Sequence, residues 1–436
     1  MTEAFLHYLW QHQMLGKGLA TTDGQPLVVL RAGELNRDAG PDFFNARVSI
    51  GGVEWVGNIE IHLRTSDWNR HHHSSDRAYN NVILHVVYEH DTEIHLANGN
   101  LPATLELRSF IHPALVANYD ALMTPPLSSG IPCAKRLPSV PDFIVCSALE
   151  RLAVERIEAK TLVVHRMLEE SCGGWEKTCY WLMARYFGGK VNALPFELLA
   201  KATDPRFLAR WNDNPRRIEA LLMGQAGLLD TYFVDDYPRQ LQADYEALRT
   251  GASLVPIDGA LWQFFRIRPA AFPTVRISQF ASLLTTTPNL FPRLLPLTTV
   301  HDIVALFNCR AADYWDSHYR FDQPSSRSSV KRLGRTMTHL LILNAWVPLL
   351  FVYGQATAQE RYREQAVSLM QQLPPEDNAV IRRFHAAGVH PVNAAQSQAL
   401  LQLYNNYCQS RRCLECRIGH SIIKQTSTPV NSHNPH

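Results

Sequence analysis

The stretch Gly33–Asp91 decides the fold of the chain, and it reads GELNRDAGPDFFNARVSIGGVEWVGNIEIHLRTSDWNRHHHSSDRAYNNVILHVVYEHD. Three runs in it are rich in β-branched and aromatic residues and nearly alternate in polarity. This pattern predicts strands over Phe43–Ile50, Val53–Arg64 and Asn81–Glu89. The pair Gly51–Gly52 predicts a tight hairpin between the first two, because glycine accepts the positive φ that such turns need.

Polar residues in this hairpin suggest a site. Asp42 follows Pro41 at the mouth of the first strand, and the hairpin brings it toward Glu60 and His62, which share one face of the second strand. Glu60 stands between Ile59 and Ile61 in a strand that should be central, where an isolated charge is costly unless it is paired or metal-bound. Two carboxylates here could hold Mg²⁺ or Mn²⁺.

This arrangement resembles the PD-(D/E)XK nuclease superfamily, in which Pro-Asp opens one strand and Glu-x-Lys lies on its hairpin partner. The matching pieces are Pro41-Asp42 and Glu60-Ile61-His62, with histidine in place of lysine. The resemblance implies cleavage of a nucleic-acid phosphodiester, with DNA favoured, with Asp42 and Glu60 on the metal and His62 in the role of the lysine. The whole chain is also similar to a bacterial family called domain of unknown function 2851, through GPDF, GNIEIH, RTSDW and YNNVILHVVY.

Composition favours a globular protein with a substantial core. The 436 residues are 46 % hydrophobic and 19 % charged, with a net charge of +2, so overall charge argues neither for nor against nucleic acid. No apolar run reaches the ~20 residues of a membrane helix, and Leu340–Tyr353 is interpreted as a buried core helix. Without an evident signal peptide or membrane segment, we expect a cytoplasmic protein with reduced or metal-bound cysteines. Oligomeric state is left open.

The distribution of strand-like and helix-like patterns along the chain predicts an α+β protein. Residues 1–125 should form a nuclease-like α/β domain with a mixed sheet, beginning with a helix capped by Thr2. Two further strands are expected at Glu93–Leu96 and Ala103–Leu107, joined by a hairpin at Asn98-Gly99. A proline-rich connector, 126–141, leads to a larger, mainly helical domain at 142–424, whose first helices are expected over Asp142–Glu170 and Trp175–Phe187. Residues 425–436 are expected to form a disordered tail.

Other polar groups near the hairpin are weaker candidates. Glu34 could have a catalytic role, and Glu34 and Asp38 could each add a metal ligand. Alternatively, both could simply lie in a solvated loop. The triplet His71–His73 with Asp76 resembles a metal cluster by composition. Three consecutive ligands are geometrically awkward, although His71 and His73 could converge in an extended segment. A polar loop is the favoured interpretation, and this loop follows Glu60 and His62 closely enough to overhang their site.

The C-terminal cysteines form a second candidate site, Cys408-x4-Cys413-x2-Cys416-x3-His420. Zn²⁺ could bind as Cys₃His with His420 as fourth ligand. An iron–sulfur cluster would need another cysteine, and Cys133 and Cys309 are candidates. The alternative is a helix whose cysteines merely pack.

Two further function classes stay open. A non-catalytic nucleic-acid-binding or scaffold protein could retain the nuclease-like fold, since His62 replaces the lysine. A zinc hydrolase built on His71, His73 and Asp76 is the least favoured class, because those side chains would have to converge on one ion.

Overall fold

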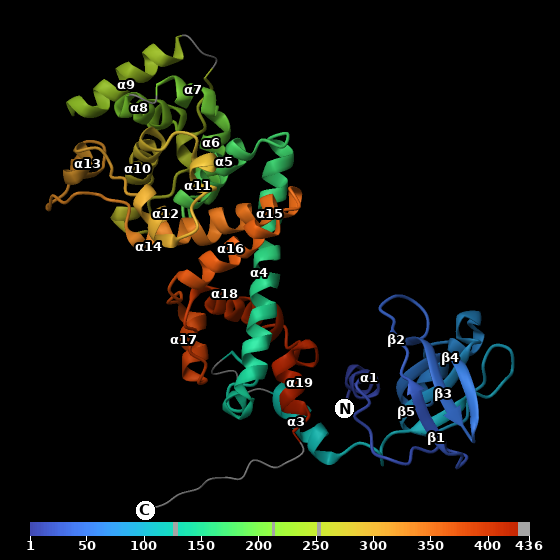
Figure 1. Ribbon diagram of the computed structural model, residues 1–436. Coiled ribbons are helices and arrows are strands. Elements are labelled where there is room, and N and C mark those ends of the chain that lie inside the picture. The colour runs from blue at the N-terminus through green and yellow to red at the C-terminus, as the bar shows by residue number, and fades with distance from the viewer. Residues whose placement is uncertain (125–129, 212–213, 251–253, 426–436) are drawn as a thin grey trace, which may run out of the picture. The chain divides into compact units, whose positions relative to one another are not determined.

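The computed structural model describes residues 1–124, 130–211, 214–250 and 254–425 (Figure 1). Two compact units divide the chain. The first contains residues 1–148, 382–389 and 403–436, and the second contains residues 149–381 and 390–402. Segments near the C-terminus that we assigned to the helical domain therefore pack with the N-terminal unit.

A mixed sheet of six strands forms the centre of the first unit (Figure 1). Its strands follow the order β1-β3-β4-β5-β6, and the short β2 also pairs with β3. β1, β3 and β4 are antiparallel neighbours, whereas β5 and β6 run parallel to β4. The bounds are β1 Leu27–Arg31, β2 Glu34–Leu35, β3 Phe43–Ile50, β4 Val53–Arg64, β5 Val82–Glu89 and β6 Ala103–Glu106.

The predicted hairpin between β3 and β4 is confirmed. Gly51 and Gly52 have φ of 59° and 84°, the positive values that allow a two-residue turn. In the outer half of β4 the side chains from Val53 to Val56 are exposed, whereas both faces are buried from Ile59 to His62. Glu60 and His62 therefore lie in the covered part of the sheet.

One predicted strand is wrong. Glu93–Leu96 forms no strand, although Asn98-Gly99 does lie in a turn closed by Gly99 N–H donating to Leu96 O at 2.9 Å. Ala103–Glu106 pairs in parallel with β5 instead of forming a hairpin with the preceding segment. Ile94 and Leu96 instead pack in a small apolar cluster, because burying these side chains competes with strand pairing.

Helices complete the first unit. α1 (Glu3–Gln11) begins at the predicted cap, where Phe5 N–H donates to Thr2 Oγ1 at 3.3 Å, and it packs against β4. Between β4 and β5 the chain makes only short turns, α2 (Asp67–Arg70), η1 (His73–Ser75) and η2 (Arg77–Tyr79). α3 (Pro113–Met123) packs against α19 (Arg417–Ile423), and η8 (Cys413–Glu415) precedes α19.

The second unit is helical, apart from a two-stranded ribbon of β7 (His318–Arg320) and β8 (Gln323–Pro324). α4 (Asp142–Glu170) leads into it and α5 (Trp175–Phe187) follows, both with their predicted bounds. Its other α-helices of ten or more residues are α6 Ala193–Ala202, α8 Pro215–Gln225, α9 Asp236–Arg249, α10 Pro273–Thr286, α15 Val347–Ala356, α16 Glu360–Gln372 and α18 Ala394–Leu403. Shorter pieces are α7 Pro205–Arg210, α11 Leu290–Leu294, α12 Val300–Leu306, α13 Tyr314–Ser317 and α14 Arg335–Leu341, while α17 Ala379–Ala386 leads back into the first unit.

One helical run is long and apolar enough to cross a membrane. It spans Arg335–Ala356 and contains a π-helical turn, Ile342–Trp346. In this structure 78 % of its most apolar window is buried, and its side chains belong to the core of the second unit. Packing of this kind agrees with the expected core helix. The predicted tail lies outside the described residues, except for Gln425, whose side chain donates to Ser139 O at 3.1 Å.

Candidate metal centre

Asp42 and Glu60 meet as the hairpin predicts. The backbone N–H of Asp42 donates to Glu60 Oε2 at 3.1 Å, and Ile61 N–H donates to Asp42 Oδ2 at 2.9 Å. Each carboxylate is therefore held by backbone from the strand that carries the other. His7 of α1 joins them, with its Nε2 atom 3.1 Å from Asp42 Oδ2. The two acids form one connected group at the junction of β3, β4 and α1.

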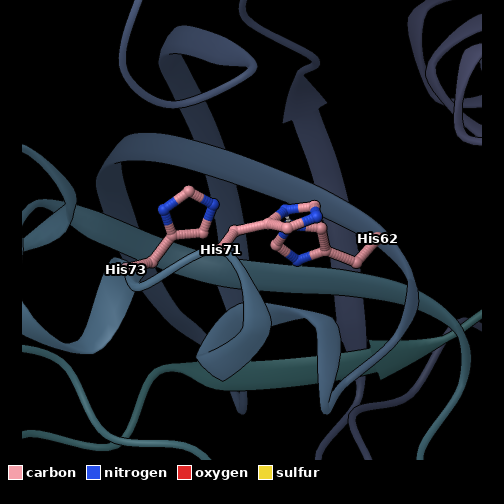
Figure 2. Close-up of side chains that lie close together, drawn as sticks. All are labelled: His62, His71 and His73. Atoms are coloured by element: carbon pink, nitrogen blue, oxygen red, sulfur yellow. Dashed lines mark hydrogen bonds between the residues drawn. The ribbon is translucent and has the colours of Figure 1, made fainter.

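Three imidazoles lie near Oε1, the second carboxylate oxygen of Glu60. Those of His73 and His62 face this oxygen, and that of His71 lies beside His62. Figure 2 shows His62 from β4 beside His71 and His73 from the following loop. His73 Nε2 lies 3.3 Å from Glu60 Oε1, and His62 Nε2 lies 3.5 Å from the same oxygen. His62 Nε2 is also 3.1 Å from His71 Nδ1. One ligand atom from each of the three histidines lies within 4.8 Å of the other two.

A short turn, rather than an extended segment, brings His71 and His73 together. His71 ends α2, His72 adopts a left-handed backbone with φ of 63°, and His73 begins η1. The reversal at His72 leaves its own imidazole outside the cluster, while its two neighbours converge. His73 stacks on Tyr79 with 3.8 Å between ring centroids, which fixes the ring that approaches Glu60.

His85 supports the cluster from the neighbouring strand. It pairs with Glu60 in the register of β5, and its Nε2 atom lies 2.9 Å from His62 Nδ1. His85 is fully buried. A histidine that binds a metal through one nitrogen commonly uses the other nitrogen in this kind of hydrogen bond, which fixes the tautomer.

Among the described residues, no lysine or arginine balances the negative charge that an ionised Glu60 would carry. Burial raises the pKa of Glu60, with Asp42 adding to the effect and His73 opposing it. Burial, together with His73 and His71, lowers the pKa of His62 to about 3, so His62 stays neutral. Burial would lower the pKa of His7, but the Asp42 carboxylate outweighs it and raises that pKa. Within the described residues, Glu60 forms no ion pair with lysine or arginine.

Three histidine nitrogens lie close enough together to share one metal ion, and Glu60 lies beside two of them. At metal–ligand distances near 2.0–2.1 Å, tetrahedral ligand atoms stand ~3.3 Å apart. Three of the six distances among Glu60 Oε1, His62 Nε2, His73 Nε2 and His71 Nδ1 are 3.1–3.5 Å, whereas only the three histidines belong to the group whose ligand atoms all lie within 4.8 Å of one another. Three imidazoles and one carboxylate suit Zn²⁺ or Fe²⁺ better than Mg²⁺, which prefers oxygen. Asp42 and the exposed His71 are the members of the site nearest solvent.

Other predicted residues lie elsewhere. Glu34 is exposed and pairs with Arg31 at 2.5 Å, so it does not join the carboxylates. Asp38 is exposed, and its backbone N–H donates to Asn36 Oδ1. Asp76 caps η2 by accepting from Ala78 N–H at 2.8 Å, rather than approaching His71 or His73. His7 was missed, because nothing in the sequence of α1 distinguishes it from the polar side of an amphipathic helix.

The three cysteines of the C-terminal candidate site lie together, whereas its histidine lies elsewhere. Cys408, Cys413 and Cys416 line one cavity together with Cys133. His420 is not among the residues that line it, and its Nδ1 atom lies 2.8 Å from Tyr8 Oη. Cys309 is buried in the second unit. The fourth ligand in this cavity would therefore be Cys133, not His420.

Comparisons with known proteins identify the chain at the level of a family. No curated protein and no solved structure matches it. The family model described as "Protein of unknown function (DUF2851)" matches residues 3–379, which include the sheet and the complete histidine site. On this match, which spans most of its length, the chain belongs to the DUF2851 family.

Proposed function

We propose that this protein is a metal-dependent phosphodiesterase that cleaves nucleic acid, with DNA as the favoured substrate. The observation that carries the proposal is Glu60: a buried carboxylate that faces two imidazole Nε2 atoms at 3.3 and 3.5 Å and lies beside Asp42. A charge in such surroundings is costly unless a cation compensates it. A divalent metal would supply that compensation.

Glu60, His62, His71 and His73 would hold the ion, and His85 would orient His62. When bound, the ion would polarise a phosphate oxygen and lower the pKa of a water molecule. Asp42, fixed by Ile61 N–H, is placed to accept a proton from attacking water at its carboxylate. His7 would keep Asp42 oriented, and its positive charge would balance that of the carboxylate.

Support for a phosphodiester substrate comes from the arrangement of the elements. The two acids lie on the β3–β4 hairpin, α1 packs against β4, and β5 follows in parallel. The placement of the two acids on one hairpin is what the resemblance to PD-(D/E)XK nucleases implies. The identity of the metal differs from the Mg²⁺ expected for such an enzyme, because imidazoles supply most of the donors.

A direct assay tests the proposal. Protein stripped with a chelator is supplied with Zn²⁺, Fe²⁺ (without oxygen), Mn²⁺ or Mg²⁺ and offered single- and double-stranded DNA, RNA and bis(p-nitrophenyl) phosphate. We expect cleavage with Zn²⁺, Fe²⁺ or Mn²⁺, and a loss of about 100-fold or more in Asp42→Asn, Glu60→Gln and His71→Asn.

The chain offers matched controls for these variants. Glu34→Gln removes a nearby acid outside the site, and His72→Asn removes the imidazole between two proposed ligands. Asparagine tolerates the left-handed backbone of His72. Both controls should cleave like the unaltered protein. Absence of turnover with every metal and substrate would contradict the proposal, as would undiminished cleavage by Asp42→Asn.

A non-catalytic nucleic-acid-binding module is the second candidate, and burial favours it. The side chains of Glu60 and His62 are only 6 % and 2 % exposed, so a phosphate would have to displace the loop that carries His71 and His73. Salt-sensitive binding of DNA without turnover, unchanged by Glu60→Gln, would identify such a module.

A further inference from the structure

Four of the eight cysteines line a single, largely enclosed cavity in the first unit. Cys133 comes from the segment before α4, whereas the other three come from the C-terminal part of the chain. The remaining lining is almost wholly apolar and consists of Pro132, Leu137, Phe384, Leu403, Tyr407, Ile418 and Gly419. The cavity has about 360 Å³ not filled by protein atoms, including its opening.

Local structure directs each C-terminal cysteine to this point. Cys408 ends a π-helical turn, Tyr404–Cys408, that continues α18. π-helical turns are uncommon and occur frequently at functional sites. Cys413 begins η8, and Cys416 immediately precedes α19. The three cysteines therefore reach the cavity from one compact run of backbone.

Tight packing holds that run in place from outside the cavity. A Cβ atom at Gly419 would lie 2.1 Å from Cys413 O, so α19 approaches the cysteine loop as closely as only glycine permits. Arg411 adopts a positive φ of 52° and donates from Nη1 to Met123 O at 2.9 Å. These contacts fix the loop without using the sulfur atoms.

The thiols interact with one another. Burial raises the pKa of Cys133 to about 12, and Cys416 and Cys413 add to the effect. Burial also raises the pKa of Cys408, and each of the other three cysteines contributes. No lysine, arginine or histidine occurs among the described residues that line the cavity. A metal centre would provide the positive charge that four thiolates require.

We propose that Cys133, Cys408, Cys413 and Cys416 bind a [4Fe–4S] cluster, one cysteine on each iron atom. The spacing of the sulfur atoms separates this cluster from a zinc site. Four thiolates on one zinc ion stand ~3.8 Å apart, because Zn–S bonds are near 2.3 Å. Among the described residues, the groups of three or more ligand atoms within 4.8 Å of one another include only the histidine triad. A cubane cluster needs the wider spacing, because its cysteines bind different irons.

The cluster would fasten the end of the chain to an early segment of the same unit. Cys133 and Cys408 are far apart in sequence, so a shared cluster closes a long loop and restricts the unfolded chain. This site shares no residue with the histidine cluster. The C-terminal cysteines also lie beyond residue 379, where the family match ends.

Analysis of protein produced and purified without oxygen tests the proposal. We expect about four iron atoms and four acid-labile sulfides per chain, with visible absorption that bleaches on reduction by dithionite. Cys133→Ser and Cys413→Ser should lose most of the iron. Cys146→Ser and Cys172→Ser, which alter exposed cysteines outside the cavity, should retain it.

X-ray absorption of the unaltered protein keeps the test decisive if the serine variants fail to fold. Iron surrounded by sulfur, with a second shell of iron, is the expected result. Stoichiometric zinc surrounded by four sulfurs would overturn the cluster. Protein without metal, whose melting temperature is unchanged by Cys413→Ser, would overturn it equally.

Discussion

Glu197 in the helical unit and Glu60 in the sheet are both buried glutamates, yet their surroundings are opposite. Glu197 is 3 % exposed. Its carboxylate oxygens form ion pairs with the side-chain nitrogens of Arg166, Arg185 and Lys201, at N–O distances of 2.9, 2.6 and 2.7 Å. Glu60 is 5 % exposed and faces imidazoles and another carboxylate. The protein itself neutralises Glu197, whereas Glu60 lacks an equivalent cation. This difference assigns Glu197 a structural role and is the reason for proposing a metal at Glu60.

The same contrast appears in their acidities. Burial would raise the pKa of Glu197, but hydrogen bonds from Arg166, Lys201 and Arg185 outweigh it and lower the pKa to about 2. At Glu60 burial prevails and the pKa is raised. The two pKa shifts have opposite signs, because cationic partners prevail at Glu197 and burial prevails at Glu60.

The largest effect on stability is expected at Glu197. Glu197→Ala should lower the free energy of unfolding by about 3 kcal/mol, because three cations lose their common partner. Glu170→Ala is the matched control, since Glu170 contacts Arg166 and Lys201 from a side chain that is 39 % exposed. The control should cost under about 1 kcal/mol. Urea denaturation followed by circular dichroism measures the free energy of unfolding of both variants. Equal losses in the two variants would show that Glu197 is no more important for stability than the exposed Glu170.

The stabilising role of Glu197 should also appear in how the free energy of unfolding changes as pH falls. A carboxyl group with a lowered pKa in the folded state stabilises the protein fully above its unfolded value, and this contribution is lost as pH falls through the folded value. The contribution of Glu197 should therefore decline from about pH 4.5 toward pH 2. Glu197→Gln should flatten this part of the stability curve. Curves that stay parallel between pH 5 and pH 2 would contradict the assignment.

Metal should stabilise the protein through Glu60. At a free metal concentration of 100 times Kd, binding adds about 2.7 kcal/mol to the free energy of unfolding. Glu60→Gln should abolish this gain, while the metal-free variant should be at least as stable as the unaltered protein, because an uncompensated buried charge is removed. Thermal melts with Zn²⁺ and with a chelator test both statements, with Glu34→Gln as control. Strong destabilisation of metal-free Glu60→Gln would assign Glu60 a structural role like that of Glu197.

A smaller effect is expected at His85, which touches the proposed site only through His62. His85→Gln should weaken metal binding by about 10- to 100-fold, because His62 loses the group that orients it. Calorimetric titration of the chelator-treated protein gives Kd, and its melting temperature without metal reports on packing. Unchanged affinity would show that His85 only fills the core.

Much of the fold follows from local rules. The strand Val53–Arg64, the glycine pair, the Thr2 cap and the bounds of α4 and α5 all appear as predicted, since each depends on residues near in sequence. The strand predicted at Glu93–Leu96 is absent, and Ala103–Glu106 pairs in parallel with β5 instead of forming a hairpin with that segment. The approach of Asp42 to Glu60 was predictable from the hairpin, but their exact pairing was not, because the register of the two strands shifts between Phe43 and Ala46.

Tertiary structure decided the rest of both sites. The sequence favoured a polar loop for His71 and His73, with a metal cluster as the alternative. Only the reversal at His72 and the stacking on Tyr79 bring His73 to Glu60 and His71 to His62. His7 and Cys133 come from segments far from their partners in sequence, and no local pattern encodes such contacts. Residue types and spacing thus identified candidate ligands. Packing of distant segments determined which of them share one point in space, because that outcome depends on the whole core.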